Sequence, residues 1–197
     1  MTLTPRNKLF TFKNVLNAVY IGAILLLFFN PWAKAMLIRA LMFVGLFQPD
    51  ITLVAKPSSI QRLPDVTFSN KDSKTLHLAD QQGKVIFVNF WATWCPPCLA
   101  EMPGINQLYN QFKGNLNVVF VTVDVDQQLT KSGAFLKKHN WNLPLYQAVS
   151  KLPQALSSES IPFTIIFDRH GKIVYRHEGT ADYSSDKMVE FIQTLSY

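Results

Sequence analysis

Two cysteines stand two residues apart in the run Trp94-Cys95-Pro96-Pro97-Cys98, and the chain has no others. This spacing is typical of a redox-active dithiol or of part of a metal site. A tetrahedral zinc site takes four nitrogen or sulfur ligands, and the four histidines show no ligand spacing to each other or to the cysteines. We therefore expect thiol–disulfide chemistry at Cys95 and Cys98, carried by the pair itself with no metal and no bound cofactor. A structural disulfide and an incidental pair are the alternatives.

The sequence around the cysteines predicts a strand before them and a helix after them. Residues 85–91 form an unbroken apolar run, typical of a strand that is buried on both faces of a sheet. Apolar residues then recur at helical spacing from Leu99 to Phe112. Cys95 is therefore expected at the helix N-terminus, where backbone N–H groups and the helix dipole lower a thiol pKa. We expect Cys95 to attack a disulfide and Cys98, one turn later, to resolve the mixed disulfide.

The remaining patterns predict an α/β fold with a mixed sheet. Gly171 lies in the turn of an expected hairpin, and Pro144 favours an edge position for the short strand around it. The order of elements, βαβα followed by ββα, predicts a mixed central sheet with helices on both faces. The expected strands are 66–68, 75–78, 85–91, 118–123, 143–146, 163–167 and 172–176, and the expected helices are 99–112, 127–140 and 184–195.

These features resemble the membrane-anchored, thioredoxin-like thiol–disulfide oxidoreductases of bacterial envelopes, the TlpA/ResA type. The resemblance covers about residues 60–195 and rests on the cysteine motif after Asn89-Phe90-Trp91-Ala92-Thr93 and on Ser160-Ile161-Pro162-Phe163-Thr164. It implies a thioredoxin-like fold, a cis peptide bond before Pro162, and a substrate peptide that pairs with the backbone at Ile161. Substrate-binding positions are then expected at Trp94, Pro96, Pro97 and Ile161, with Pro162 counted among the catalytic residues.

Glu101 extends the resemblance, because the family places a glutamate three residues after the second cysteine. There it tunes thiol pKa values and relays protons. Cys98 and Glu101 are spaced i, i+3 and so share one helix face. The alternative is a solvated glutamate in the first turn, favoured by the helix dipole.

The net charge of +6 is concentrated at the N-terminus. Residues 1–59 carry six basic and one acidic side chain, whereas residues 60–197 carry 13 basic and 12 acidic ones. A nearly neutral domain offers no electrostatic footprint for a phosphate backbone, so we expect no nucleic-acid binding.

The N-terminal segment predicts a membrane anchor. Residues 14–33 are 20 uncharged residues, enough for a helix about 30 Å long, which is the thickness of a hydrocarbon core. Basic residues before it place the N-terminus in the cytosol and the rest of the chain on the periplasmic or extracytoplasmic side. A signal peptide cleaved at Ala33-Lys34-Ala35 is one alternative. A hairpin that returns through residues 36–47, which would leave the domain in the cytosol, is another. The predicted organisation is a tail and transmembrane anchor (1–34), an interfacial segment and linker (35–59) and a thioredoxin-like domain (60–197).

The expected function is that of an anchored thiol–disulfide oxidoreductase. The resemblance implies a reductive direction, a disulfide-containing envelope protein such as apocytochrome c as substrate, and a membrane electron donor that restores the dithiol. Two prolines between the cysteines remove two backbone donors, which raises the thiolate pKa and also favours a reductant. A disulfide oxidase or isomerase and a non-catalytic peptide-binding module are the alternatives.

Overall fold

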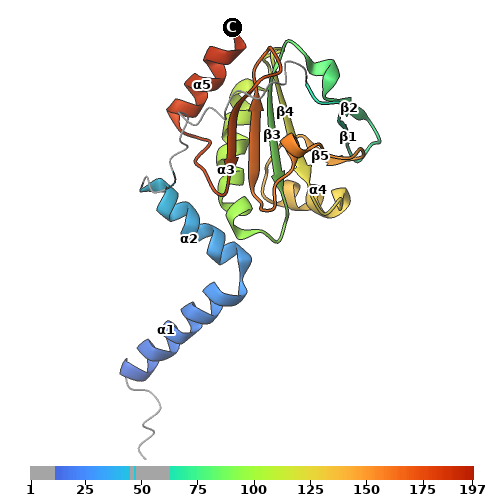
Figure 1. Cartoon of the computed structure of the whole chain (residues 1–197). Coiled ribbons are helices and arrows are strands. Elements are labelled where there is room, and N and C mark those ends of the chain that lie inside the picture. Colours follow the sequence, from blue (N-terminus) through green and yellow to red (C-terminus); the bar gives the residue numbers. More distant parts are fainter. Residues whose placement is uncertain (1–11, 45–46, 48–62) are drawn as a thin grey trace, which may run out of the picture.

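A seven-stranded mixed sheet forms the centre of the computed structural model, which describes residues 12–44, 47 and 63–197 (Figure 1). The strand order is β2-β1-β5-β4-β3-β6-β7. β3 pairs in parallel with β4 and antiparallel with β6, so the predicted mixed sheet is confirmed. The strands are β1 (Thr67–Ser69), β2 (Thr75–His77), β3 (Val85–Trp91), β4 (Val118–Asp124), β5 (Leu145–Ala148), β6 (Phe163–Phe167) and β7 (Ile173–Glu178).

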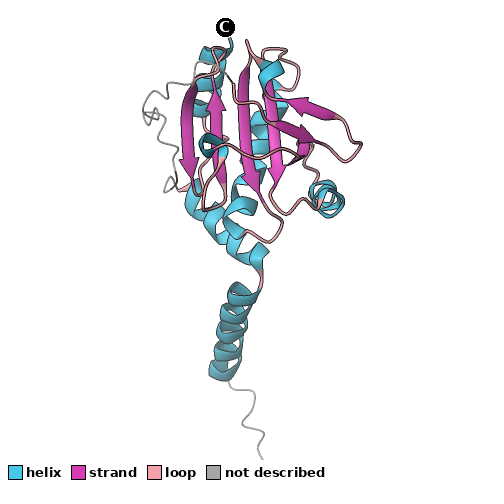
Figure 2. Ribbon diagram, turned by 45° about the vertical axis from the view of Figure 1, so that its right-hand side comes forward, coloured by secondary structure: helices cyan, strands magenta, loops and turns pink. Residues whose placement is uncertain are grey.

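Three longer helices accompany the sheet (Figure 2): α3 (Pro96–Phe112), α4 (Leu129–Lys138) and α5 (Asp186–Ser196). Residues of all three join one apolar cluster with Phe87 and Trp91 of β3. The opposite face packs against a second cluster, in which the helical cover is short: the 3-10 helix η3 (Gln154–Leu156) contributes Leu156. A further 3-10 helix, η2 (Ala79–Gln81), precedes β3.

Strand β3 is buried along its whole length, as its apolar run predicts. Successive side chains of a strand point to opposite faces of the sheet. Phe87 and Trp91 accordingly belong to the cluster beneath α3, whereas Ile86, Val88 and Phe90 belong to the cluster on the other face. Asn89 has the parity of Phe87 and Trp91, so its polar side chain points to the face that α3 covers.

The prediction that the strand near Pro144 lies at an edge is wrong. β5 lies inside the sheet, between β4, its parallel partner, and β1, its antiparallel partner. Pro144 immediately precedes β5, and its carbonyl oxygen accepts the N–H of Thr122 in β4. β5 thereby joins the β1–β2 hairpin to the rest of the sheet.

Two helices precede the domain. The uncharged stretch does not continue as one helix to residue 33, because α1 (Phe12–Phe29) ends before Asn30 and α2 (Pro31–Phe43) begins after it. Asn30 is extended (φ −103°, ψ 110°), as expected before a proline, and its side chain accepts the N–H groups of Trp32 and Ala33. α1 is apolar and long enough to cross a membrane, and none of it is buried in the described structure. α2 instead packs against α3.

Candidate functional site

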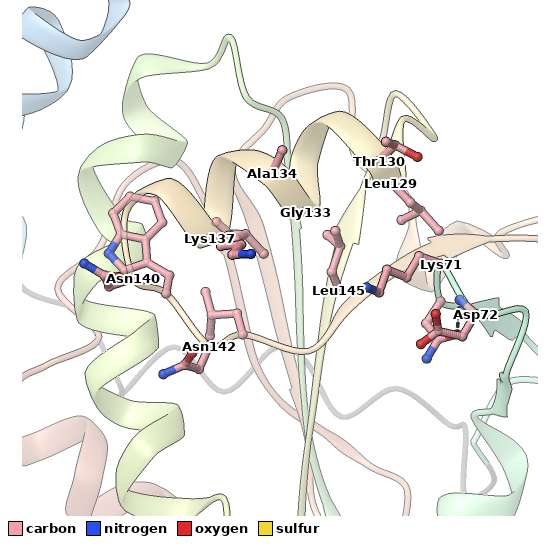
Figure 3. Close-up of a pocket in the computed structure, with 14 residues that line it drawn as sticks. Lys71, Asp72, Leu129, Thr130, Gly133, Ala134, Lys137, Asn140, Asn142 and Leu145 are labelled. Atoms are coloured by element: carbon pink, nitrogen blue, oxygen red, sulfur yellow. Dashed lines mark hydrogen bonds between the residues drawn. The ribbon is translucent and has the colours of Figure 1, made fainter.

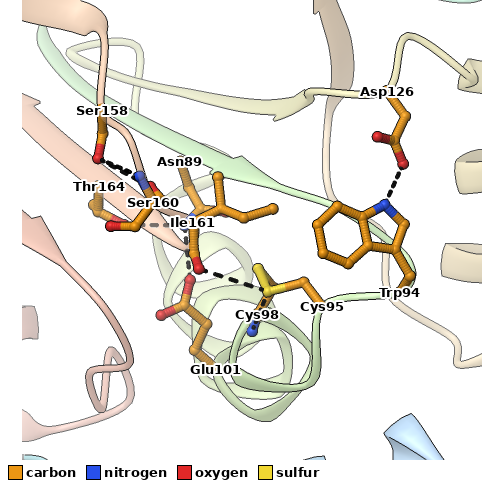
Figure 4. The surroundings of a disulfide bond; sticks show 10 residues. All are labelled: Asn89, Trp94, Cys95, Cys98, Glu101, Asp126, Ser158, Ser160, Ile161 and Thr164. Carbon is orange, nitrogen blue, oxygen red and sulfur yellow. Dashed lines mark hydrogen bonds between the residues drawn. A yellow bond between two sulfur atoms is a disulfide. The ribbon is translucent and has the colours of Figure 1, made fainter.

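The cysteine pair begins helix α3, as predicted. Cys95 is the N-cap residue and forms a disulfide with Cys98, with the two Cα atoms 5.3 Å apart (Figure 4). The Cys98 N–H points at the Cys95 sulfur at 3.2 Å. Pro96 and Pro97 occupy the first helical turn and supply no N–H groups. A thiolate at Cys95 would therefore receive one backbone N–H from the residues of this turn.

The loop before β6 lies against the cysteine pair. The Ile161–Pro162 peptide bond is cis, as the family resemblance implies. The Cys95 Sγ lies 3.8 Å from the carbonyl oxygen of Ile161 (Figure 4). The register of the sheet explains this contact, because Phe90 near the end of β3 pairs with Phe163 at the start of β6. The cysteine loop and the proline loop therefore leave the sheet side by side.

A buried polar network lies behind the disulfide. The Asn89 Nδ2 group donates to Glu101 Oε1 at 2.8 Å and to Thr164 Oγ1 at 3.0 Å (Figure 4). Asn89 and Thr164 are direct partners across β3 and β6, so their side chains share a face and lie close together. All three residues are at most 1% exposed. Glu101 is thus not a solvated helix residue, and it lies one turn from Cys98.

Burial governs the acid–base properties of this network. Loss of solvation raises the pKa of Glu101 well above its ordinary value, although the hydrogen bond from Asn89 opposes the shift. Burial likewise raises the pKa of Tyr183, and the nearby Glu101 carboxylate adds to the effect. The backbone N–H of Ala181 also opposes the shift of Glu101, although the Oε2 atom of Glu101 accepts no well-formed hydrogen bond from a described residue. A buried carboxyl group with a raised pKa therefore lies one turn from Cys98 on α3.

The remaining expected site residues differ in their exposure to solvent. Trp94 is 56% exposed, and its indole N–H donates to Asp126 Oδ2 at 2.7 Å. Pro96, Pro97 and Ile161 are half-buried, whereas Pro162 is buried. Cys95 is 3% exposed and Cys98 is inaccessible. Of the two cysteines, Cys95 is therefore the more accessible to solvent.

Acidic residues near the site have a structural role. Asp124 accepts the backbone N–H groups of Asp126 and Gln128 and the hydroxyl of Ser132, so it fixes the turn into α4. Within the described ranges, no group of three or more histidine, cysteine or acidic side chains is arranged to hold a metal ion.

Two surface hollows lie at different places relative to the disulfide: one adjoins it and the other does not. A small one of about 120 Å³ includes Ile161 and is otherwise lined largely by apolar residues such as Phe90, Val125 and Leu156. A larger one of about 650 Å³ lies between α4, β5 and the β1–β2 turn, with Lys71 and Lys137 at its border (Figure 3). The larger hollow contains none of the predicted site residues, so the small one is the hollow that adjoins the redox site.

Sequence reasoning did not assign roles to Asn89, Thr164 or Tyr183. One signal was available, because Asn89 is the single polar residue in the otherwise apolar run of β3. A buried amide needs a partner. The identity of that partner depends on the register between β3 and β6, which the sequence does not specify.

Comparison with known proteins agrees with this geometry. The model of the family described as Redoxin matches residues 59–190. The thiol-disulfide oxidoreductase ResA of Bacillus thuringiensis subsp. konkukian is 26% identical over 154 residues, covering 77% of this chain and 86% of that protein. The protein of the same name from Halalkalibacterium halodurans is 30% identical over 127 residues, covering 63% and 69%.

A solved structure of a thioredoxin-family thiol:disulfide interchange protein from Chlorobium tepidum superposes with a TM-score of 0.59 at 25% identity, covering 73% of this chain and 99% of that one. Sequence and fold thus agree on one kind of protein: the chain belongs to the Redoxin family and is related to the ResA-type thiol-disulfide oxidoreductases.

Proposed function

We propose that the protein is a thiol–disulfide oxidoreductase that reduces disulfides of extracytoplasmic proteins. The observation that carries the proposal is the Cys95–Cys98 disulfide at the N-terminus of α3, directly beside the Ile161–Pro162 loop, in a chain similar to ResA. In the reduced protein, the Cys95 thiolate attacks a substrate disulfide and forms a mixed disulfide. Cys98 then attacks Cys95, the reduced substrate leaves, and two electrons have passed from the dithiol to the substrate.

Glu101 provides the proton chemistry of the second step. Cys98 must lose its proton in order to attack, and it is inaccessible to water. The Glu101 carboxylate follows one turn later on α3. Because burial raises its pKa, the carboxylate is a stronger proton acceptor than an ordinary glutamate. Asn89 holds one oxygen and so fixes the orientation of the carboxylate.

The surface around Cys95 is the proposed substrate site. Trp94, Pro96 and Pro97 border one side of the sulfur, and Ile161 borders the other. An extended peptide could pair with the backbone at Ile161 while its disulfide meets Cys95. Pro162 follows Ile161 in this loop, and as a proline it has no backbone N–H to offer to the peptide.

The reductive direction and the membrane placement belong to the same proposal. Only one backbone N–H reaches the Cys95 sulfur from the proline-containing turn, so the thiolate gains little stabilisation, which favours a reducing dithiol. We assign residues 1–34 to a cytoplasmic tail and anchor, 35–59 to an interfacial segment and linker, and 60–197 to the catalytic domain. A membrane electron donor would restore the dithiol.

Turnover of a model disulfide protein by the full chain in detergent, with a small dithiol added to restore the Cys95–Cys98 dithiol after each cycle, tests this function. We expect activity that Cys95→Ser abolishes, and a trapped mixed disulfide in Cys98→Ser. Absence of turnover would favour a peptide-binding module. A reduction potential of about −270 to −220 mV would support the reductive direction, whereas one near −120 mV would indicate an oxidant.

A further inference from the structure

Helix α2 packs one face onto the catalytic domain. Ala35 and Met42 are buried, and with half-buried Trp32 and Ile38 they join the apolar cluster that contains Cys95, Cys98 and Leu99 of the catalytic helix. Four residues after the end of α2, the carbonyl oxygen of Phe47 accepts the N–H of Asp182. The segment after α1 is therefore not a free tether where the structure describes it, because it is docked along the domain.

An aromatic chain runs from the start of α2 toward the active site. The Trp32 ring stacks on His139 at 4.3 Å and lies 6.5 Å from Phe135 of α4, measured between ring centroids. Phe135 in turn lies 6.3 Å from Trp91, the last residue of β3. Cys95 follows Trp91 by four residues. Trp32 is thus connected through Phe135 to Trp91, the last residue of the strand that precedes the cysteine motif.

The active site is consequently on the side of the domain from which α1 leaves. Trp32 is only three residues beyond Phe29, the last residue of α1. In Figure 1, the loop between β3 and α3 lies at the end of the sheet nearest α1 and α2. α1 itself extends away from the domain in both overall views (Figures 1 and 2).

The outer face of α2 is apolar and uncovered. Met36 and Leu37 are 51% exposed and Leu41 is 38% exposed, and the C-cap residue Val44 is 70% exposed. This face continues from α1, which is apolar and unburied, with Asn30 alone between the two helices. Lys34 and Arg39 are also exposed on α2. An exposed apolar face with flanking basic residues, attached directly to an apolar span, fits the interface of a lipid bilayer.

We infer that α2 lies between the bilayer surface and the catalytic helix, so that the Cys95–Cys98 site is held close to the membrane and faces it. This inference rests on the proposed function and specifies its partners. They are disulfides and dithiols carried at the level of the lipid headgroups, on membrane proteins or on chains that emerge at the membrane. The docked α2 limits the distance between the bilayer surface and the cysteine pair, because a 13-residue helix spans only about 20 Å.

Lipid-borne thiols of two lengths test the inference with the full chain in nanodiscs. In the short-arm lipid the thiol is attached directly to the headgroup, and in the long-arm lipid it is attached through a polyethylene glycol spacer. A lipid thiolate attacks the protein disulfide, a second lipid thiol releases the mixed disulfide, and the products are a lipid disulfide and the protein dithiol. Alkylation followed by mass measurement counts the protein thiols formed, and dithiothreitol provides the soluble control.

We expect the short-arm lipid to open the disulfide at least as fast as the long-arm lipid, because the effective thiol concentration is highest when the arm matches the distance to be spanned. Reaction with the long-arm lipid alone, or failure of the chain to enter the bilayer, would overturn the inference. A disulfide that dithiothreitol cannot open would instead contradict the proposed function.

Loosening α2 supplies the second test. Trp32→Ala removes the ring that contacts Phe135 and His139. We expect the short-arm rate to fall by about tenfold while the dithiothreitol rate is unchanged. Tyr20→Ala, which removes an exposed aromatic side chain from α1, is the matched control and should preserve both rates. An unchanged short-arm rate in Trp32→Ala would overturn the role of α2.

Discussion

Replacing Glu101 with glutamine should remove a pH dependence from the stability of the oxidised protein. In the unfolded chain this carboxyl ionises near its ordinary pKa of 4.5, whereas burial holds its pKa well above that value in the folded protein. Between the two pKa values, the folded state keeps a proton that the unfolded state has lost. The free energy of unfolding therefore falls as the pH rises through this window, by about 1.4 kcal/mol per pH unit.

The loss has defined limits. Below pH 4.5 the carboxyl is protonated in both states, so Glu101 causes no loss in the free energy of unfolding there. Above the folded pKa it is ionised in both states, and the loss is complete. Glutamine keeps the shape of the side chain and the acceptor oxygen for Asn89, but it cannot ionise. The difference between the wild-type and Glu101→Gln curves should therefore show the slope of about 1.4 kcal/mol per pH unit.

Urea unfolding followed by tryptophan fluorescence from pH 4 to pH 9 measures this difference. A chain of residues 30–197 omits α1 and keeps Asn30, the N-cap residue of α2. The dependence on urea must stay the same in both proteins for the comparison to report stability. Glu190→Gln, at an exposed position on α5, is the matched control and should parallel the wild type. If the Glu101→Gln curve also parallels the wild type at every pH, the assignment of a raised pKa to Glu101 is wrong.

Two further predictions concern neighbours of the disulfide. Asn89→Ala leaves Glu101 and Thr164 without their common hydrogen-bond partner in the core, and should lower the free energy of unfolding by about 3 kcal/mol; a change below about 1 kcal/mol in the same urea assay would show that the network is unimportant for stability. Trp94→Phe removes the donor to Asp126 at the surface and should change stability by less than about 1 kcal/mol while raising KM for a model disulfide protein. An unchanged KM in steady-state assays would exclude Trp94 from the substrate site.

Several features of this protein follow from local sequence. Strand β3 and the start of α3 are predictable because an unbroken apolar run and two prolines leave few alternatives. The cis bond before Pro162 was implied by the family resemblance alone. The partners of Glu101 were not predictable, because they depend on how β6 pairs with β3. The interior position of β5 likewise depends on long-range pairing with β1.

The docking of α2 shows the same limit. Its residues are apolar on several faces, so the sequence alone fits a membrane-interface helix. The side that contacts the domain is set by a tertiary contact, between Trp32 and the aromatic residues of α4 and the segment after it. Two sides of one helix can therefore have different environments that the sequence pattern does not distinguish.

The small accessible area of the cysteine pair has a consequence for the substrates of the enzyme. Exchange requires three sulfur atoms in line, and Cys95 offers only 3% of its surface while Cys98 offers none. A substrate disulfide must therefore reach the Cys95 sulfur through a small opening beside Ile161. With so little of the cysteine pair exposed, the accessibility of the substrate's own disulfide becomes the factor that limits exchange.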